Sequence, residues 1–138
     1  MLPSDLEALI LNDALYYPRG DSAEISALLD EFQIDQSSPI AKFLKAHVLQ
    51  FAGSGNSERI GSEQLVDPLG PDRTAAWIKD IYSLGPGQIS LTTDEGEGIV
   101  YYDSHTDQVR LRLLPDISGN SDEILSQGFY DFLREYLG

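Results

Sequence analysis

The sequence predicts an α+β fold in which helices precede an antiparallel meander of strands and one amphipathic helix follows it. The meander is the stretch 88–113, where three runs rich in β-branched and aromatic residues are separated by two polar turns. Helical periodicity before and after this stretch is the second observation. The third is length, because 138 residues suit one domain, 1–138, that buries a core without disulfides or metals.

Three helices are predicted in the N-terminal part of the chain. The first starts at Ser4, which forms a capping box with Glu7, and ends at the turn 16–20. The second covers 22–32, capped by Asp21 or Ser22. The third covers 38–51 and opens with a capping serine followed by proline. Their apolar stripes are Leu6, Leu9, Ile10 and Leu15; Ile25, Leu28, Leu29 and Phe32; and Ile40, Phe43, Leu44, Val48 and Phe51.

The segment 56–87 admits more than one interpretation. Residues 59–66 fit either a short strand or an irregular segment. A fourth helix is predicted from Pro71 or Asp72 to about Ser83, with Ala75, Ile78, Tyr82 and one of Trp77 and Ile81 facing the core. Alternatively, the segment is an insertion that covers one edge of the sheet and protects unpaired strand groups.

Within the meander, residues 99–102 are β-branched and aromatic and are predicted to form the central strand. We expect one of Tyr101 and Tyr102 to pack inward and the other to lie on the outer face. In the next strand Val109, Leu111 and Leu113 share one side, with Arg110 and Arg112 on the other. A final helix is predicted to start at Ser121 or Asp122 and to include Gly128. Its apolar face is Leu125, Phe129, Phe132, Leu133 and Tyr136.

Charge and composition exclude several classes of function. The chain has 23 acidic and 9 basic residues, a formal net charge of −14, which repels nucleic acid and anionic membrane surfaces. We therefore expect no direct nucleic-acid binding and no membrane association. The charge serves either solubility alone or electrostatic steering toward a cationic protein partner.

Targeting and redox features are those of a cytoplasmic protein. The N-terminal run carries Asp5 and Glu7 and lacks a basic start, so no secretory signal is expected. No apolar run approaches the roughly 18 residues that span a bilayer. The absence of cysteine excludes a disulfide scaffold, a thiolate nucleophile and cysteine-ligated metal sites.

Residues that could carry chemistry form no convincing motif. Asp103, His105 and Asp107 alternate along a polar turn, which suits a divalent cation but fits a hydrated turn better. His47 lies at the edge of an apolar stripe, which is typical of a packed core-edge residue. The two histidines are far apart in the sequence, so no local nucleophile–base pair exists. We expect no enzymatic activity, no cofactor and no metal.

The two acidic turns of the meander form the predicted partner-binding surface. Core packing does not require these loops to be acidic. A rigid aromatic ring among anions suits recognition of an arginine-rich protein partner. The predicted contact residues are Asp94, Glu95, Glu97, Tyr101, Asp103 and Asp107.

Three stretches of the chain share motifs with a known family. The first, ISLTTDEGEGIVYYDSHTDQV, has an apolar strand, an acidic turn with glycine, a Val-Tyr-Tyr-Asp strand and a polar turn. The second, GFYDFLREYL, carries a Phe-x-x-Phe-Leu helix core, and the third, LLDEFQIDQSSPIAKFLKAH, reads as an earlier pair of helices. Together these stretches resemble the SUKH superfamily, which includes fungal cell-wall synthesis regulators and bacterial immunity proteins. The resemblance implies an antiparallel-rich mixed sheet flanked by helices. It also implies a non-enzymatic binding role, which in bacterial members is often the neutralisation of competition toxins.

Three functions are therefore compared. The leading expectation is an immunity protein that neutralises a bacterial competition toxin, with the net charge favouring a basic toxin domain. The second is an acidic secretion chaperone, a class that is typically dimeric. The third is a small carboxylate-based enzyme, which would need a deep pocket lined by perturbed carboxylates. The sequence leaves the oligomeric state open.

Overall fold

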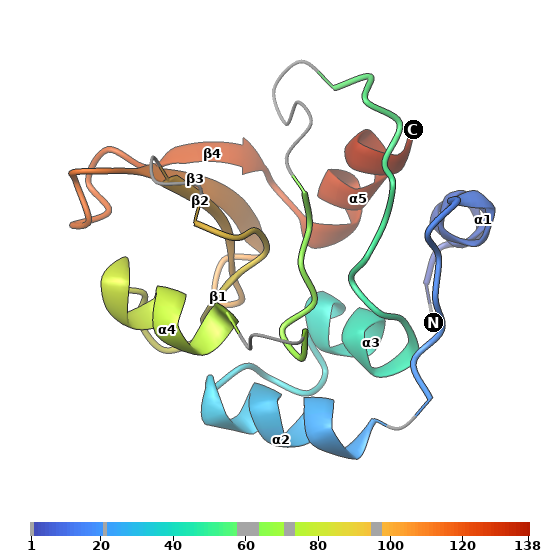
Figure 1. Ribbon diagram of the computed structural model, residues 1–138, viewed down its shortest axis with the longest axis horizontal. Coiled ribbons are helices and arrows are strands. Elements are labelled where there is room, and N and C mark those ends of the chain that lie inside the picture. Colours follow the sequence, from blue (N-terminus) through green and yellow to red (C-terminus); the bar gives the residue numbers. More distant parts are fainter. Residues whose placement is uncertain (1, 21, 58–63, 71–73, 95–97) are drawn as a thin grey trace.

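The computed structural model describes residues 2–20, 22–57, 64–70, 74–94 and 98–138. Its helices and strands form an α+β fold, which confirms the predicted fold class (Figure 1). In chain order the elements are α1 (Ser4–Asn12), α2 (Ala23–Glu31), α3 (Pro39–Ala46), α4 (Thr74–Ile81), β1 (Gln88–Ser90), β2 (Gly98–Asp103), β3 (Gln108–Leu113), β4 (Glu123–Ser126) and α5 (Phe129–Leu137). None of the described helices is both long enough and apolar enough to cross a membrane.

The four strands form one sheet in the order β1-β2-β3-β4, so each strand pairs with its neighbours in sequence. All of these pairings are antiparallel. The predicted meander is therefore confirmed, with β2 inside the sheet, and β4 extends it by one strand. The predicted antiparallel-rich sheet thus contains no parallel pair among the described strands.

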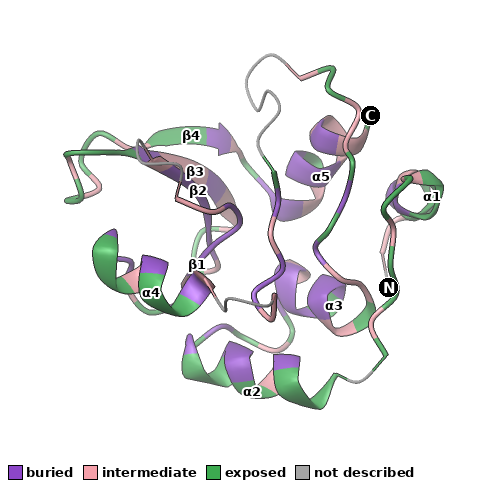
Figure 2. Cartoon of the chain, in the orientation of Figure 1, coloured by how far each residue is buried: buried purple, intermediate pink, exposed green. Residues whose placement is uncertain are grey.

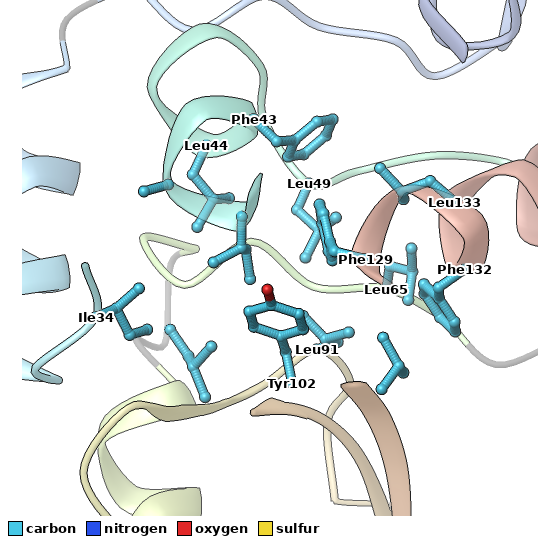
Figure 3. Packing of buried hydrophobic residues seen from close by; sticks show 14 of the residues in the cluster. Ile34, Phe43, Leu44, Leu49, Leu65, Leu91, Tyr102, Phe129, Phe132 and Leu133 are labelled. Atoms are coloured by element: carbon cyan, nitrogen blue, oxygen red, sulfur yellow. The ribbon is translucent and has the colours of Figure 1, made fainter. Parts of the chain in front are cut away.

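The larger core lies between one face of the sheet and the helices α1, α2, α3 and α5 (Figures 1 and 3). Phe129 at the start of α5 is central to it, because its ring meets Phe43 of α3 at 5.5 Å and Tyr102 of β2 at 5.4 Å. Figure 3 shows Tyr102 and Leu91 directed toward Phe129 and Leu49. Edge-to-face contacts of this kind fix ring orientation as well as burying apolar area.

A smaller core lies on the other face of the sheet, under α4. It consists of Ile78, Tyr82, Leu84, Ile99 and Tyr101. Along β2, alternate residues therefore enter different cores, and neither Tyr101 nor Tyr102 is exposed. The expectation that one of these tyrosines lies on an outer face is wrong, because α4 covers the face that would otherwise meet solvent.

The segment 64–70 protects part of the β1 edge of the sheet. Leu65 forms an antiparallel bridge with Thr92, and the Val66 amide donates to the Leu91 carbonyl at 2.8 Å. This agrees with the alternative that residues 56–87 include a covering segment. The described part of 59–66 is Gln64, Leu65 and Val66, which make an isolated bridge and not a strand, while 59–63 lie outside the described residues.

The N-terminal helix packs against the C-terminal one. Leu6 and Ile10 of α1 are fully buried. Nε of Arg134 in α5 lies 2.8 Å from a carboxylate oxygen of Asp5 in α1. The loop after α3 also reaches α5, since the Ser54 amide donates to the Tyr136 carbonyl at 2.9 Å.

Several predicted helix boundaries are corrected. Pro3 occupies the N-cap of α1 without a side-chain bond, so Ser4 is a helical residue and the expected capping box is absent. The capping of α3 is confirmed, because Ser38 Oγ accepts from the Ala41 amide at 3.3 Å. However, α3 ends at Ala46, where the chain pairs with the segment that follows α1: Arg19 donates its amide to the Ala46 carbonyl at 3.0 Å.

The apolar stripes are confirmed in their central positions and wrong at their margins. Leu15 is 44% exposed, because α1 has already ended at Asn12. Trp77 and Ile81 are both exposed, although one of them was expected to face the core. Ala75 and Ile78 of α4, and Tyr82 just after the helix, are buried as predicted.

The prediction that the final helix starts at Ser121 or Asp122 is wrong, because a strand precedes this helix. Residues 123–126 form β4, and α5 begins at Phe129 with Gly128 at its N-cap. Gly128 is therefore not inside a helix. Its φ of −172° is ordinary extended backbone, so the position does not require glycine conformationally.

Candidate functional site

The first acidic turn of the predicted surface is described in part. Asp94 is half-buried and accepts a hydrogen bond from the Tyr82 hydroxyl at 2.7 Å. Burial, followed by the nearby Asp94 carboxylate, raises the pKa of Tyr82 well above its usual range. Glu95 and Glu97 lie outside the described residues. The described part of this turn thus supports the smaller core.

Asp103, at the end of β2, is buried with 6% exposure. One carboxylate oxygen accepts from the His105 amide at 2.9 Å, and the other accepts from Nε2 of Gln88 at 3.1 Å. Arg110 completes the arrangement, with Nη1 at 3.4 Å from Oδ2 of Asp103. The carboxylate therefore joins β1, β3 and the following turn.

Asp107 lies in the turn between β2 and β3 with φ at 51°, a left-handed conformation that aspartate tolerates better than most residues. Its Oδ1 accepts from the Tyr102 hydroxyl at 2.6 Å and from the Phe129 amide at 3.2 Å. Burial, followed by this carboxylate, raises the pKa of Tyr102. A negative charge at the first amide of α5 also complements the helix dipole.

Tyr101 belongs to a buried polar cluster between the sheet and α4. Its hydroxyl donates to Asp122, and the guanidinium of Arg112 lies 4.9 Å from its ring centroid. Arg112 binds Asp122 through Nε at 3.0 Å and Nη2 at 2.9 Å, and Nη1 donates to the Tyr82 carbonyl at 2.7 Å. Burial, followed by Asp122, raises the pKa of Tyr101. This cluster connects β2, β3, α4 and the loop before β4.

The described residues of the predicted surface do not form one exposed face. Tyr101 and Asp103 lie on the α4 side of β2, whereas Asp107 reaches the opposite core through Tyr102. Tyr101 and Asp103 are also buried, so neither presents a side chain to a partner. The geometric premise of an exposed tyrosine among anions is corrected, because the carboxylates serve as acceptors for buried donors.

Sequence reasoning missed the two residues that organise this region, Arg112 and Asp122. Arg110 and Arg112 lie on the same face of a predicted strand. If that face is covered, each arginine needs a carboxylate partner, so a buried ion pair could have been predicted here. Asp122 was instead assigned as a possible helix cap. Its true partner lies ten positions earlier and could be identified only once β4 returns the chain beside β3.

His47 lies at the end of α3 beside a cavity of about 520 Å³. Its Nδ1 is 3.2 Å from the Tyr16 hydroxyl, and its ring is 5.3 Å from that of Phe43. Burial lowers the pKa of His47, and the charge of Glu7 opposes this effect. Lys42 and Lys45 also line the cavity. His47 is thus a packed residue at the core edge, as its sequence position predicts.

A second cavity, of about 370 Å³, is lined mainly by apolar residues near Leu49 and Leu65. Its charged residues are Arg19 and Asp67, whose Nη2 and Oδ1 atoms are 2.5 Å apart. Asp67 also accepts the Leu49 amide at 2.8 Å. Both charged groups therefore stabilise the fold through these contacts. Within the described ranges, no group of three or more metal-ligating side chains is assembled.

The exposed surface of the described residues is strongly acidic. The exposed acids are Asp5, Glu7, Glu24, Asp30, Glu31, Asp35, Asp80, Glu123 and Asp131. Among the described basic residues only Lys42 is exposed. Arg19 and Arg112 are held in buried ion pairs, which removes their charges from the surface. The described part of the surface therefore carries an excess of negative charge.

Comparisons of the chain with protein-family models, with curated proteins and with solved structures find no match. Among the features of the described residues, the exposed acidic surface has the clearest chemical preference, which is for cationic partners.

Proposed function

We propose that this chain is a non-enzymatic binding module whose partner is a cationic protein. The observation that carries the proposal is the asymmetry of charge exposure: nine described acids are exposed, against one described base. Such a surface attracts basic proteins over distances of about one Debye length, roughly 8–10 Å at physiological salt. It repels nucleic acids and anionic membranes.

The most specific form of the proposal is an immunity protein that acts in the cytoplasm and neutralises a basic toxin domain of a bacterial competition system. The resemblance of 89–109 and 128–137 to the SUKH superfamily supports it. The α+β architecture agrees with the fold that this resemblance implies. A stoichiometric binder needs a rigid, charged surface and no catalytic group.

The internal use of the buried carboxylates favours binding over catalysis. Asp67, Asp103 and Asp122 each lie in an ion pair with an arginine. Among the described residues, no buried side-chain nitrogen or oxygen is without a hydrogen-bond partner. A carboxylate enzyme would instead need a carboxylate of strongly perturbed pKa that faces its substrate in a pocket.

Affinity capture from host extracts tests the proposal. We expect the immobilised chain to retain a basic protein at about 50 mM salt and to release it at about 500 mM, because salt screens surface charges. Mass spectrometry identifies the retained protein, and light scattering of the purified pair gives its stoichiometry. If no basic protein is retained at the lower salt, the proposal fails. A stable dimer of the chain alone would favour the secretion chaperone instead.

A further inference from the structure

One face of α4 is apolar and open to solvent. Trp77 is 41% exposed and Ile81 is 46% exposed, and Ala76 and Asp80 beside them are exposed as well. These four positions are spaced i, i+1, i+4 and i+5, so they share one side of the helix. We call them the α4 docking face. Figure 2 shows exposed residues along α4 next to the buried ones that meet the sheet.

The opposite side of α4 holds this face in position. Ala75 and Ile78 are buried, and Tyr82 just beyond the helix is anchored at both its hydroxyl and its carbonyl. The hydroxyl donates to Asp94, and the carbonyl accepts from Arg112. The exposed Trp77 therefore stands on a fixed support, which lowers the entropy cost of binding through it.

Among the described residues, the exposed charges at and beside the α4 docking face are acidic. Asp80 lies within the face. Lys79 is directed to α2 instead, with its Nζ 5.0 Å from the centroid of the Phe32 ring. That contact places the C-terminal end of α2, where Asp30 and Glu31 are exposed, next to α4. An aromatic and aliphatic centre with an acidic rim selects a ligand that is both basic and apolar.

We propose that the α4 docking face receives a cationic protein segment that carries an apolar anchor. The anchor packs on Trp77 and Ile81, and arginine or lysine side chains pair with Asp80 and Glu31. A guanidinium over the Trp77 ring adds a cation–π contact. A second copy of the chain is a poor occupant, because two acidic faces would meet. This inference rests on the proposed function and names the surface through which that function acts.

Two synthetic helical peptides of equal positive charge test the surface directly. One alternates arginine-rich and leucine-rich faces, and the other carries serine in place of leucine. Since the chain has one tryptophan, its emission reports on this face alone. We expect the arginine–leucine peptide to shift the Trp77 emission to shorter wavelength and to bind about tenfold more tightly than the arginine–serine peptide.

Substitutions test whether the preference for the arginine–leucine peptide depends on the α4 docking face. Ile81→Ala and Trp77→Ala are expected to abolish the tenfold preference for the leucine peptide, measured by calorimetry, while Trp77→Phe retains part of it. The matched control is Tyr17→Ala, which removes an aromatic residue that is 64% exposed but lies between α1 and α2. It is expected to keep the preference. Circular dichroism of each variant verifies folding.

Other results overturn the inference. Equal binding of both peptides would show that the α4 docking face does not recognise an apolar anchor. A preference that survives Trp77→Ala and Ile81→Ala would show that the peptide binds elsewhere. A dimer of the chain that Trp77→Ala dissociates would also overturn the inference, because the occupant would then be a second copy. Failure of the proposed function is distinguishable, since it appears as the absence of a salt-released basic protein in host capture while the peptide preference remains.

Discussion

At the scale of single residues, three buried tyrosine hydroxyls donate to carboxylates in neighbouring turns and loops. The pairs are Tyr82–Asp94, Tyr101–Asp122 and Tyr102–Asp107. A buried hydroxyl left without a partner costs about 1–3 kcal/mol. Asp94, Asp107 and Asp122 thus support the fold, although the sequence alone makes Asp94 and Asp107 resemble part of a binding surface.

Replacement of Asp107 by alanine is expected to lower the free energy of unfolding by about 1–3 kcal/mol, because the buried Tyr102 hydroxyl and the first amide of α5 lose their acceptor. Urea denaturation followed by circular dichroism measures the change. Asp107→Asn keeps an oxygen acceptor and tolerates the positive φ, so it should cost less. If the two variants are equally destabilised, the hydrogen bonds are not the cause.

Arg112→Ala is expected to destabilise the fold by about 3–5 kcal/mol, because it leaves the Asp122 carboxylate buried without its charge partner. Arg112→Lys should recover only part of this loss, since one ammonium group cannot reach both Asp122 and the Tyr82 carbonyl as the guanidinium does. The matched control is Arg134→Lys, whose ion pair with Asp5 is largely exposed and should change stability by less than about 0.5 kcal/mol.

At the scale of elements, the helix stripes and the strands at 89–93 and 109–113 could be predicted from their periods along the chain, and the central strand from its β-branched and aromatic residues. The start of α5 could not. Leu125 stands four positions before Phe129 and continues its helical stripe, so periodicity alone cannot separate β4 from α5. The hydrogen bonds that distinguish them are tertiary: β4 pairs with β3, and Asp107 meets the first amide of α5.

The candidate site was less predictable than the fold, for a related reason. The run 99–102 is apolar at every position, which is typical of a strand buried on both faces. The sequence does not say which helix covers the second face. Because α4 covers that face, Tyr101 is a core residue, and Trp77 on the outer side of α4 is exposed.

The pairing of β2 with β3 depends on Gly98. A Cβ at this position would lie 2.6 Å from the Arg112 carbonyl oxygen and 2.7 Å from Cδ2 of Leu113. Gly98→Ala is therefore expected to cost about 1–3 kcal/mol, because the backbone of β3 must move. Gly85→Ala is the control, since its nearest contact would be an ordinary 3.8 Å. Thermal unfolding should separate the two, and equal melting temperatures would contradict the steric argument.

At the scale of the whole molecule, the three tyrosine–carboxylate pairs predict loss of stability in alkali. In the unfolded chain tyrosine ionises near pH 10. In the folded chain burial raises the pKa of Tyr82, Tyr101 and Tyr102, each with a further contribution from its carboxylate. Above about pH 10 the folded state thus binds more protons than the unfolded state, and the free energy of unfolding falls as pH rises.

An alkaline titration checks this expectation. Absorbance near 295 nm reports tyrosine ionisation, and far-ultraviolet circular dichroism reports the fold. We expect the last tyrosines to ionise only as the helical signal is lost. Full ionisation with an unchanged helical signal would show that these hydroxyls are accessible in the folded state.

The packing of α1 against α5 has a consequence for how the chain folds during its synthesis. Asp5 and Arg134 are separated by 129 positions, and Leu6 and Ile10 are buried in a core completed by α5. Because α1 is synthesised before α5, its apolar side stays uncovered until the residues between the two helices and α5 itself have been made. Closing so long a loop slows folding, whereas the local meander can form earlier. The interval in which a chaperone or a protease can act on α1 therefore lasts at least as long as the synthesis of the residues from α1 to α5.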